Sequence, residues 1–227
     1  MKTQDAIYFD EERPFIKARG LGLKTMIGAP YSNVNLTIPP DSLAMIYGDH
    51  GSGKTPLLLT LAGRMVSTKG ELEVAGYELP KERHRVAKIA GLGLFTGLND
   101  LEENLPASLI LRSELELYGK PHRKVAVVDY FAKWGLSHIQ NMLVRDLSQP
   151  DLVRFGIALG MVNDPQLLVV DDVQDQLTLE QIGEIVTLLK SLAHDGHKVV
   201  VMGCTEGSIT HSADYLYKLE KDDTHGM

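Results

Sequence analysis

Residues 48–55 combine three glycines with a lysine and two hydroxyl side chains. They read Gly48, Asp49, His50, Gly51, Ser52, Gly53, Lys54 and Thr55, which matches the phosphate-binding P-loop pattern Gly-x-x-x-x-Gly-Lys-[Ser/Thr]. Glycines let consecutive backbone N–H groups point at phosphate oxygens. Lys54 supplies a positive charge for the β- and γ-phosphates, and the Thr55 hydroxyl can coordinate Mg²⁺. The segment therefore predicts a site for a nucleoside triphosphate with Mg²⁺.

The sequence on both sides of this loop predicts the elements that hold it. Residues 43–47 are a short apolar run typical of a buried strand, and residues 57–63 are typical of an apolar helix. A helix that begins at the loop adds the positive end of its dipole to the phosphate site. Because a chance glycine-rich turn seldom lies between a strand and a helix, we interpret the segment as a P-loop.

Two carboxylates follow another apolar run. Residues 167–170 predict a fully buried strand that ends in Asp171 and Asp172. Asp171 is placed to hold Mg²⁺ through water, and its alternative role is a helix N-cap. A helix over about 179–193 and a strand over 198–202 follow. Strands that alternate with helices predict an α/β fold with a mostly parallel sheet and helices on both faces.

Two segments depart from this alternation. Residues 70–76 alternate in polarity and end in glycine, which predicts a hairpin and so an antiparallel β part. Residues 101–160 are mostly helical in pattern, and within them Val125, Val128, Phe131, Ala132 and Leu136 recur at helical spacing. We therefore expect a single domain over 1–227, with a core of about 1–97 and 161–227 and an inserted helical subdomain of about 98–160.

The composition narrows the classes of partner and compartment. The 227 residues include 23 basic and 30 acidic side chains, a formal charge of −7. This acidic balance argues against nucleic acid as the main partner. Cys204 is the single cysteine, so no intrachain disulfide can form and a reducing compartment is expected. We see no signal-peptide core and no apolar run of roughly 18 residues, and we expect a soluble, cytoplasmic protein.

Taken in order, these landmarks resemble the ATP-binding cassette (ABC) ATPases over nearly the whole chain. The segments that carry the resemblance, besides the P-loop, are 19–21, 34–40, 61–63, 70–72, 101–105, 147–148 and 163–172. The resemblance implies a P-loop NTPase fold of ABC type, with ATP and Mg²⁺ as ligands. It also implies a membrane-spanning transporter subunit as partner at the inner face of the cell membrane. A homodimer, or a heterodimer with another cassette, is expected.

The resemblance also assigns roles to single residues. Thr55 and Asp171 would hold Mg²⁺, and Asp172 falls at the catalytic carboxylate, where the family has glutamate. Its carboxylate is one methylene short, and a displacement near 1 Å can cost on the order of 100-fold in rate. Ser148 is the remnant of the signature Leu-Ser-Gly-Gly-Gln, which faces the nucleotide of the opposite protomer. Here that segment reads Leu147-Ser148-Gln149-Pro150-Asp151, which should weaken ATP-driven closure of a dimer.

Other departures from the family surround the predicted reaction centre. Leu94 stands where the family has a glutamine, and Cys204 stands where it has a histidine that senses the γ-phosphate. Pro56 removes one amide from the first turn of the P-loop helix. Thr25 or Met26 lies where an aromatic ring usually stacks on adenine, so Tyr31 is the nearest aromatic substitute. These changes predict a site that still binds the nucleotide but hydrolyses it poorly.

Two functions remain open at this point, and so does the role of one P-loop residue. One is the ATP-binding subunit of an ABC transporter or transporter-like membrane complex that hydrolyses Mg-ATP weakly. The alternative is a non-catalytic nucleotide-sensing or scaffolding protein. A soluble ABC protein that acts on nucleic acid is disfavoured by the acidic charge. The ring of His50 could reach phosphate or a partner surface, and the simpler interpretation is an exposed, variable loop position.

Overall fold

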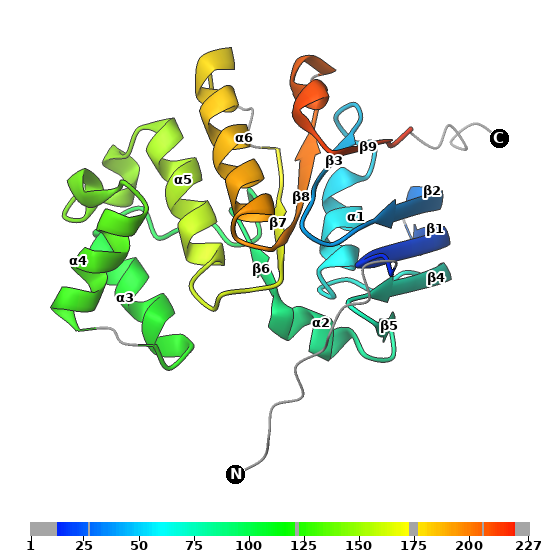
Figure 1. Cartoon of the computed structure of the whole chain (residues 1–227), viewed down its shortest axis with the longest axis horizontal. Helices are drawn as coiled ribbons and strands as arrows, with labels where there is room; N and C mark the ends of the chain where they lie inside the picture. Colours follow the sequence, from blue (N-terminus) through cyan, green and yellow to red (C-terminus); the bar gives the residue numbers. More distant parts are fainter. Residues whose placement is uncertain (1–12, 27, 121–122, 173–176, 206, 221–227) are drawn as a thin grey trace, which may run out of the picture.

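The computed structural model describes residues 13–26, 28–120, 123–172, 177–205 and 207–220, and it is organised around two sheets (Figure 1). The larger sheet has the strand order β6-β7-β8-β3-β9, and all of its strand pairs are parallel. Its strands are β3 (Leu43–Tyr47), β6 (Ala90–Leu92), β7 (Leu167–Val170), β8 (Val199–Cys204) and β9 (Tyr215–Lys218). The predicted parallel sheet is confirmed.

The second sheet is antiparallel, with the order β2-β1-β4-β5. Its strands are β1 (Ile16–Thr25), β2 (Gly28–Ile38), β4 (Lys69–Val74) and β5 (Tyr77–Leu79). The turn between β4 and β5 places Ala75 and Gly76 at φ angles of 51° and 80°. Glycine adopts this left-handed conformation without steric cost, which is why the predicted hairpin turns here.

The central strands are apolar throughout because helices cover both faces of the parallel sheet. In β7, Leu167 and Val169 pack into a core shared with the antiparallel sheet, while Leu168 and Val170 pack into a second core. Figure 1 shows α1 (Lys54–Leu61) between the two sheets. The helices α5 (Gln149–Gly160) and α6 (Leu179–His194) lie on the opposite side of the parallel sheet. This arrangement is the α/β fold that the sequence predicts.

The chain between β6 and β7 is largely helical and gathers at one end of the molecule (Figure 1). Besides α5 it contains α3 (Ala107–Leu117), α4 (Lys124–Lys133), and the short 3₁₀ turns η1 (Ser137–Ile139) and η2 (Val144–Asp146). Elsewhere lie α2 (Arg83–Ile89) and the 3₁₀ turn η3 (Gly207–Ser212). Among the helices of the described ranges, none combines the length and the apolar character needed to cross a bilayer.

The buried face of α4 differs from the one that the apolar spacing predicts. Val125 is 71% exposed and Val128 is exposed as well, whereas Val127 and Phe131 are buried. The helix ends at Lys133, so Leu136 is buried beyond its end. Two faces of α4 are apolar, and the packing of Phe131 on Phe155 of α5, with ring centroids 5.7 Å apart, selects one of them. The sequence pattern alone does not distinguish the two faces.

Candidate functional site

The P-loop connects the end of β3 to the beginning of α1, as the sequence predicts. The backbone N–H of Gly48 donates a hydrogen bond of 3.2 Å to the carbonyl of Cys204, which ties the loop to β8. The N–H of Ser52 donates to the Asp49 carbonyl at 3.1 Å and closes the turn. The loop therefore lies at the edge of the sheet where the parallel strands β3 and β8 end.

Two of the glycines are required by close approaches of backbone. Gly53 has a φ angle of 94°, and a Cβ atom there would lie 1.9 Å from the carbonyl oxygen of Pro30. A Cβ atom on Gly48 would lie 2.4 Å from the carbonyl oxygen of Leu219. Real Cβ atoms do not approach backbone so closely, so only glycine fits at these two positions. The spacing of the motif is thus a packing requirement as well as a phosphate-binding one.

Lys54 is buried inside the loop, with 6% of its surface exposed. Its Nζ atom donates to the carbonyls of Gly48 at 2.7 Å and Asp49 at 3.1 Å. An ammonium group carries three donors, so a third N–H is left for an anion in the loop. Ser52 Oγ is also buried and has no hydrogen-bond partner among the described residues. The loop thus offers a positive charge and an unpaired hydroxyl.

Thr55 and Asp171 meet although they belong to different elements. The Thr55 hydroxyl donates a short hydrogen bond to Asp171 Oδ2. Burial raises the pKa of Asp171 above its ordinary value, and the Thr55 hydrogen bond opposes that shift. Gly203 of β8 leaves room for the carboxylate, since a Cβ atom there would lie 2.7 Å from Asp171 Oδ1. Thr178, not Asp171, is the N-cap of α6, so Asp171 caps no helix of the described residues.

The oxygens of Thr55 and Asp171 suit a hard divalent cation. Mg²⁺ prefers hydroxyl, carboxylate and water oxygens and usually binds through one or two carboxylates plus substrate phosphates. Asp171 Oδ1 is buried and has no hydrogen-bond partner within the described part of the chain. The residues present therefore fit Mg²⁺ beside the phosphate-binding loop.

Asp172 lies next to this pair and has an unusual backbone conformation, with a φ angle of 28°. Positive φ is uncommon outside glycine, and it directs this side chain away from the path of an extended strand. Asp172 Oδ2 accepts a hydrogen bond of 2.8 Å from the Thr205 hydroxyl. The Nδ1 atom of His50 lies 3.9 Å from the same oxygen. Asp172 therefore stands between the P-loop and the end of β8.

A cleft of about 820 Å³ unites these groups. The described residues that line it are His50, Thr55, Thr96, Asp171, Asp172, Leu177, Thr178, Leu179, Ile182 and Thr205. One wall carries hydroxyl, imidazole and carboxylate groups, while the start of α6 contributes apolar side chains. A polar reaction edge beside an apolar wall is typical of a ligand cleft.

Two residues that line this cleft, Thr96 and Thr205, were not predicted from the sequence. Cys204, placed where the family has its γ-phosphate histidine, is fully buried in the core, and burial raises the pKa of its thiol to about 11. The next residue, Thr205, reaches the cleft instead. Leu94 does not line the cleft; a Cβ atom on Gly156 of α5 would lie 2.3 Å from its Cγ atom, so it packs there. Thr96, two positions on, does line it.

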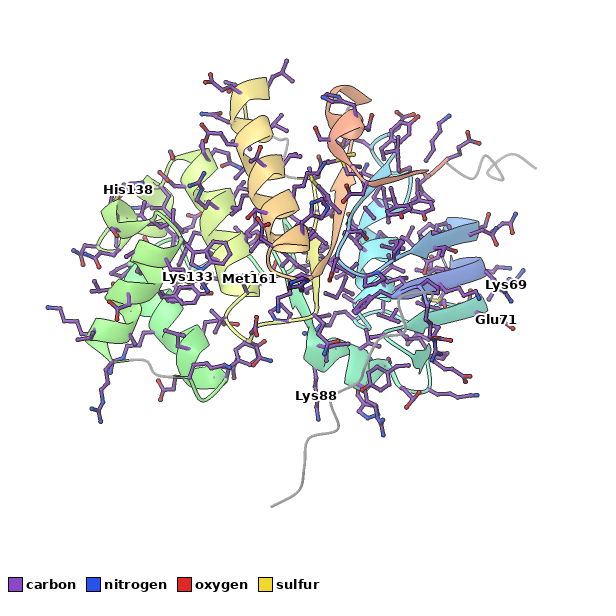
Figure 2. All side chains as sticks on the ribbon, in the orientation of Figure 1. Lys69, Glu71, Lys88, Lys133, His138 and Met161 are labelled. Carbon is purple, nitrogen blue, oxygen red and sulfur yellow. The ribbon has the colours of Figure 1, made fainter. Side chains whose placement is uncertain are left out.

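The signature remnant lies away from the cleft, at the first turn of α5. Ser148 is the N-cap of α5, and its hydroxyl donates to Asp151 Oδ2 at 2.6 Å. The backbone N–H of Asp151 donates back to Ser148 Oγ at 3.3 Å. His138 Nε2 is hydrogen-bonded to Asp151 Oδ1 at 3.0 Å. Figure 2 shows His138 among the helices, at the end of the molecule opposite Lys69 and Glu71. A carboxylate therefore stands at the helix N-terminus.

Tyr31 is not a candidate for stacking on adenine. Its side chain is fully buried, and its hydroxyl shares a 2.7 Å hydrogen bond with Thr60 Oγ1 of α1. Burial raises the pKa of the Tyr31 hydroxyl, against the effect of that hydrogen bond. Met26 is fully exposed near the tip of the β1–β2 hairpin. Tyr31, the nearest aromatic substitute in the sequence, is excluded from this role because β2 turns its ring into the core.

Comparison with known proteins gives consistent matches. The chain is 25% identical over 185 residues to the lantibiotic transport ATP-binding protein SrtF of Streptococcus pyogenes, covering 82% of this chain and 78% of that protein. It shares its fold with cbiO1 from Clostridium perfringens, described as part of the ABC transporter complex cbiONQ. That likeness has a TM-score of 0.80 and 18% identity over 92% of this chain and 86% of the other.

A dimeric structure of MJ0796, described as a bacterial ABC transporter cassette, has the same fold. Its TM-score is 0.78 at 21% identity, over 91% of this chain and 94% of the other. The family described as ABC transporter matches residues 31–174, which is more than half of the 227 residues and includes the P-loop, Ser148 and both aspartates. On that match, the chain belongs to the ABC transporter family and is a nucleotide-binding domain of it.

Proposed function

We propose that this chain is the ATP-binding subunit of an ABC transporter or of a transporter-like membrane complex, which binds Mg-ATP and hydrolyses it slowly. The observation that carries the proposal is the convergence of Lys54, Thr55 and Asp171 on one edge of the sheet. In this proposal Lys54 binds the β- and γ-phosphates through its remaining donor, while Thr55 and Asp171 hold Mg²⁺. The amides of residues 48–55 surround the phosphates.

Asp172 is the proposed general base for hydrolysis. Its carboxylate would accept a proton from the water that attacks the terminal phosphorus, with ADP as the leaving group. Two features make this step slow. The side chain is one methylene shorter than the glutamate that stands at this place in the family. Its Oδ2 atom already accepts a hydrogen bond from the Thr205 hydroxyl. A base that is displaced and already hydrogen-bonded removes a proton less effectively.

Partners follow from the family and its relatives rather than from this chain alone. We propose a membrane-spanning subunit as partner, with the chain peripheral to the cytoplasmic face of the membrane. The segment of about 98–160 would act as a helical subdomain, and the core of about 1–97 and 161–227 would bind the nucleotide. Pairing with a second cassette, as homodimer or heterodimer, would place the signature remnant Ser148 toward the partner's nucleotide.

Thermal unfolding and phosphate release test this proposal together. ATP with Mg²⁺ at 100 times its dissociation constant should stabilise the chain by about 2.7 kcal/mol. The variant Lys54→Ala should lose both this stabilisation and phosphate release, and Asp172→Asn should keep the first and lose the second. Lys133→Ala, on the exposed side of α4, is the matched control. Equal rates of phosphate release in wild type, Lys54→Ala and Asp172→Asn would contradict the proposed ATP hydrolysis.

A non-catalytic nucleotide sensor is the second candidate, and a specific observation favours it. The N-terminus of α5 is occupied by Asp151, whose carboxylate is held by Ser148 and His138. A negative charge there opposes the approach of a partner's triphosphate. Under this alternative ATP stabilises the chain, but phosphate release stays at background in wild type and in Asp172→Asn alike.

A further inference from the structure

His50 occupies an unusual place in the P-loop. Its ring belongs to the lining of the cleft, together with Thr55, Asp171 and Asp172. Its side chain is 85% exposed, and Nδ1 lies 3.9 Å from Asp172 Oδ2. That separation exceeds a hydrogen bond, so the ring is close to the carboxylate and free to turn. Among the described residues that line the cleft, it is the only one with an imidazole.

The groups around His50 fix which part of a nucleotide it would meet. The carbonyls of Gly48 and Asp49, directly before His50, accept the hydrogen bonds of Lys54 Nζ. The imidazole and the ammonium group therefore border the same turn of the loop. On its other side His50 faces Asp172, next to the Thr55–Asp171 pair. A phosphate chain that passes Lys54 toward these carboxylates brings its terminal group to His50.

Charge gives His50 a specific task at that end of the site. Asp171 and Asp172 place two carboxylates where the terminal phosphate adds further negative charge. The hydroxyl of Thr205, the residue that follows β8, donates its hydrogen bond to Asp172. An imidazole donates from at least one ring nitrogen in either protonation state, so it can stabilise the phosphate beside those carboxylates. A diphosphate has no group at that position.

We propose that His50 donates a hydrogen bond to the terminal phosphate of a nucleoside triphosphate and thereby makes the site prefer triphosphate to diphosphate. This inference rests on the proposed function, because it assumes that the P-loop binds the nucleotide. In the proposal His50 contributes the preference for triphosphate. Lys54 and the backbone amides bind the diphosphate part that both nucleotides have in common.

Direct binding of ATP and ADP tests the proposal. Dissociation constants would be measured by calorimetry with Mg²⁺ for the full chain, for His50→Ala and for His50→Gln. His84→Ala is the matched control, because that exposed histidine of α2 does not line the cleft. We expect His50→Ala to weaken ATP binding about tenfold, the effect of losing a hydrogen bond to a charged group. ADP binding should be unchanged, and His50→Gln should restore part of the preference.

The possible outcomes separate this inference from the proposed function. If wild type binds both nucleotides and His50→Ala weakens them equally, or weakens neither, His50 is an exposed loop position and the inference is wrong. If wild type binds neither ATP nor ADP, the proposed function fails and the inference fails with it. A lost ATP preference in His50→Ala, with an unchanged melting temperature and recovery in His50→Gln, supports it.

Discussion

The hydroxyl of Thr55, in the first turn of α1, donates a hydrogen bond to the carboxylate of Asp171, 116 positions later in the chain. The two residues meet because β3 and β7 flank β8 in one parallel sheet and end at the same edge. Gly203 of β8, which lacks a side chain, leaves space for the carboxylate between them. This contact joins the phosphate loop to the proposed metal ligand.

Removal of the carboxylate at position 171 should abolish the effect of Mg²⁺ on ATP binding. In Asp171→Asn we expect the same ATP dissociation constant with Mg²⁺ and with a chelator, because a neutral amide is a poor ligand for a hard cation. In wild type Mg²⁺ should tighten binding. Asp129→Asn, an exposed change on α4, is the control and should behave as wild type. A Mg²⁺ effect of wild-type size in Asp171→Asn would exclude Asp171 as the ligand.

Lengthening the side chain at position 172 should raise turnover. Asp172→Glu moves the carboxylate about one methylene toward the cleft, and we expect phosphate release to rise by as much as about 100-fold at saturating Mg-ATP. Leu94→Gln should leave turnover unchanged, because Leu94 packs on Gly156 outside the cleft. This replaces the expectation that position 94 limits the reaction. A lower rate in Asp172→Glu would show that the short side chain is not limiting.

Neutralising Asp151 should separate stability from association. Asp151→Asn weakens the hydrogen bond from the Ser148 hydroxyl and removes an anion from the first turn of α5. We expect a loss of about 0.5–1 kcal/mol in the free energy of unfolding. If this helix faces a partner's triphosphate, the same change should increase ATP-dependent dimerisation, measured by light scattering. Dimerisation that is unchanged, with the stability loss present, would assign Asp151 to the helix cap alone.

The stability of the chain should depend on pH through Asp214. Burial raises the pKa of Asp214, but hydrogen bonds from the Leu43 N–H at 2.8 Å and from His194 outweigh it, and the net pKa is lowered. A lowered folded-state pKa stabilises the fold above the unfolded pKa, and this contribution is lost as pH falls through the folded value. Asp214→Asn should therefore cost about 1 kcal/mol at pH 7.

The difference in melting temperature between Asp214→Asn and wild type should shrink as the pH is lowered below the usual carboxylate range. Thermal melts from pH 7 downward would measure it. Asp129→Asn serves again as the matched control, since it carries the same change on an exposed helix face. A difference that stays constant across the range would mean that the Asp214 carboxylate does not titrate below its ordinary pKa.

Much of the fold could be predicted because its signals are local. The strand before Gly48, the helix after Lys54 and the fully buried strand over residues 167–170 each follow from a continuous run of apolar residues. The backbone approaches closely at Gly48 and Gly53, so both positions require glycine. The motif can therefore be recognised in the sequence. Such features need no knowledge of neighbouring elements, so a single sequence is sufficient to predict them.

The failures lie where a side chain has two possible directions. Tyr31 is an aromatic near the expected base site whose ring lies in the core, and Cys204 is buried while Thr205 reaches the cleft. Leu94 turns to α5, and Val127 of α4 is buried in place of Val125. A shift of one position exchanges the faces of a strand, and a shift of two positions turns a helical side chain to nearly the opposite face. Which face is buried depends on the neighbouring element.

The chemical groups available to this protein can be identified from its amino-acid sequence: a P-loop with its lysine and threonine, two aspartates after an apolar strand, and a signature that has lost its glycines. Which of these groups lie close together follows from the packing of the folded chain. It brings Thr55, Asp171 and His50 to one cleft and leaves Ser148 bound to Asp151 elsewhere. The physical reason is that the order of parallel strands and the packing of helices, which are non-local, set where each strand end points.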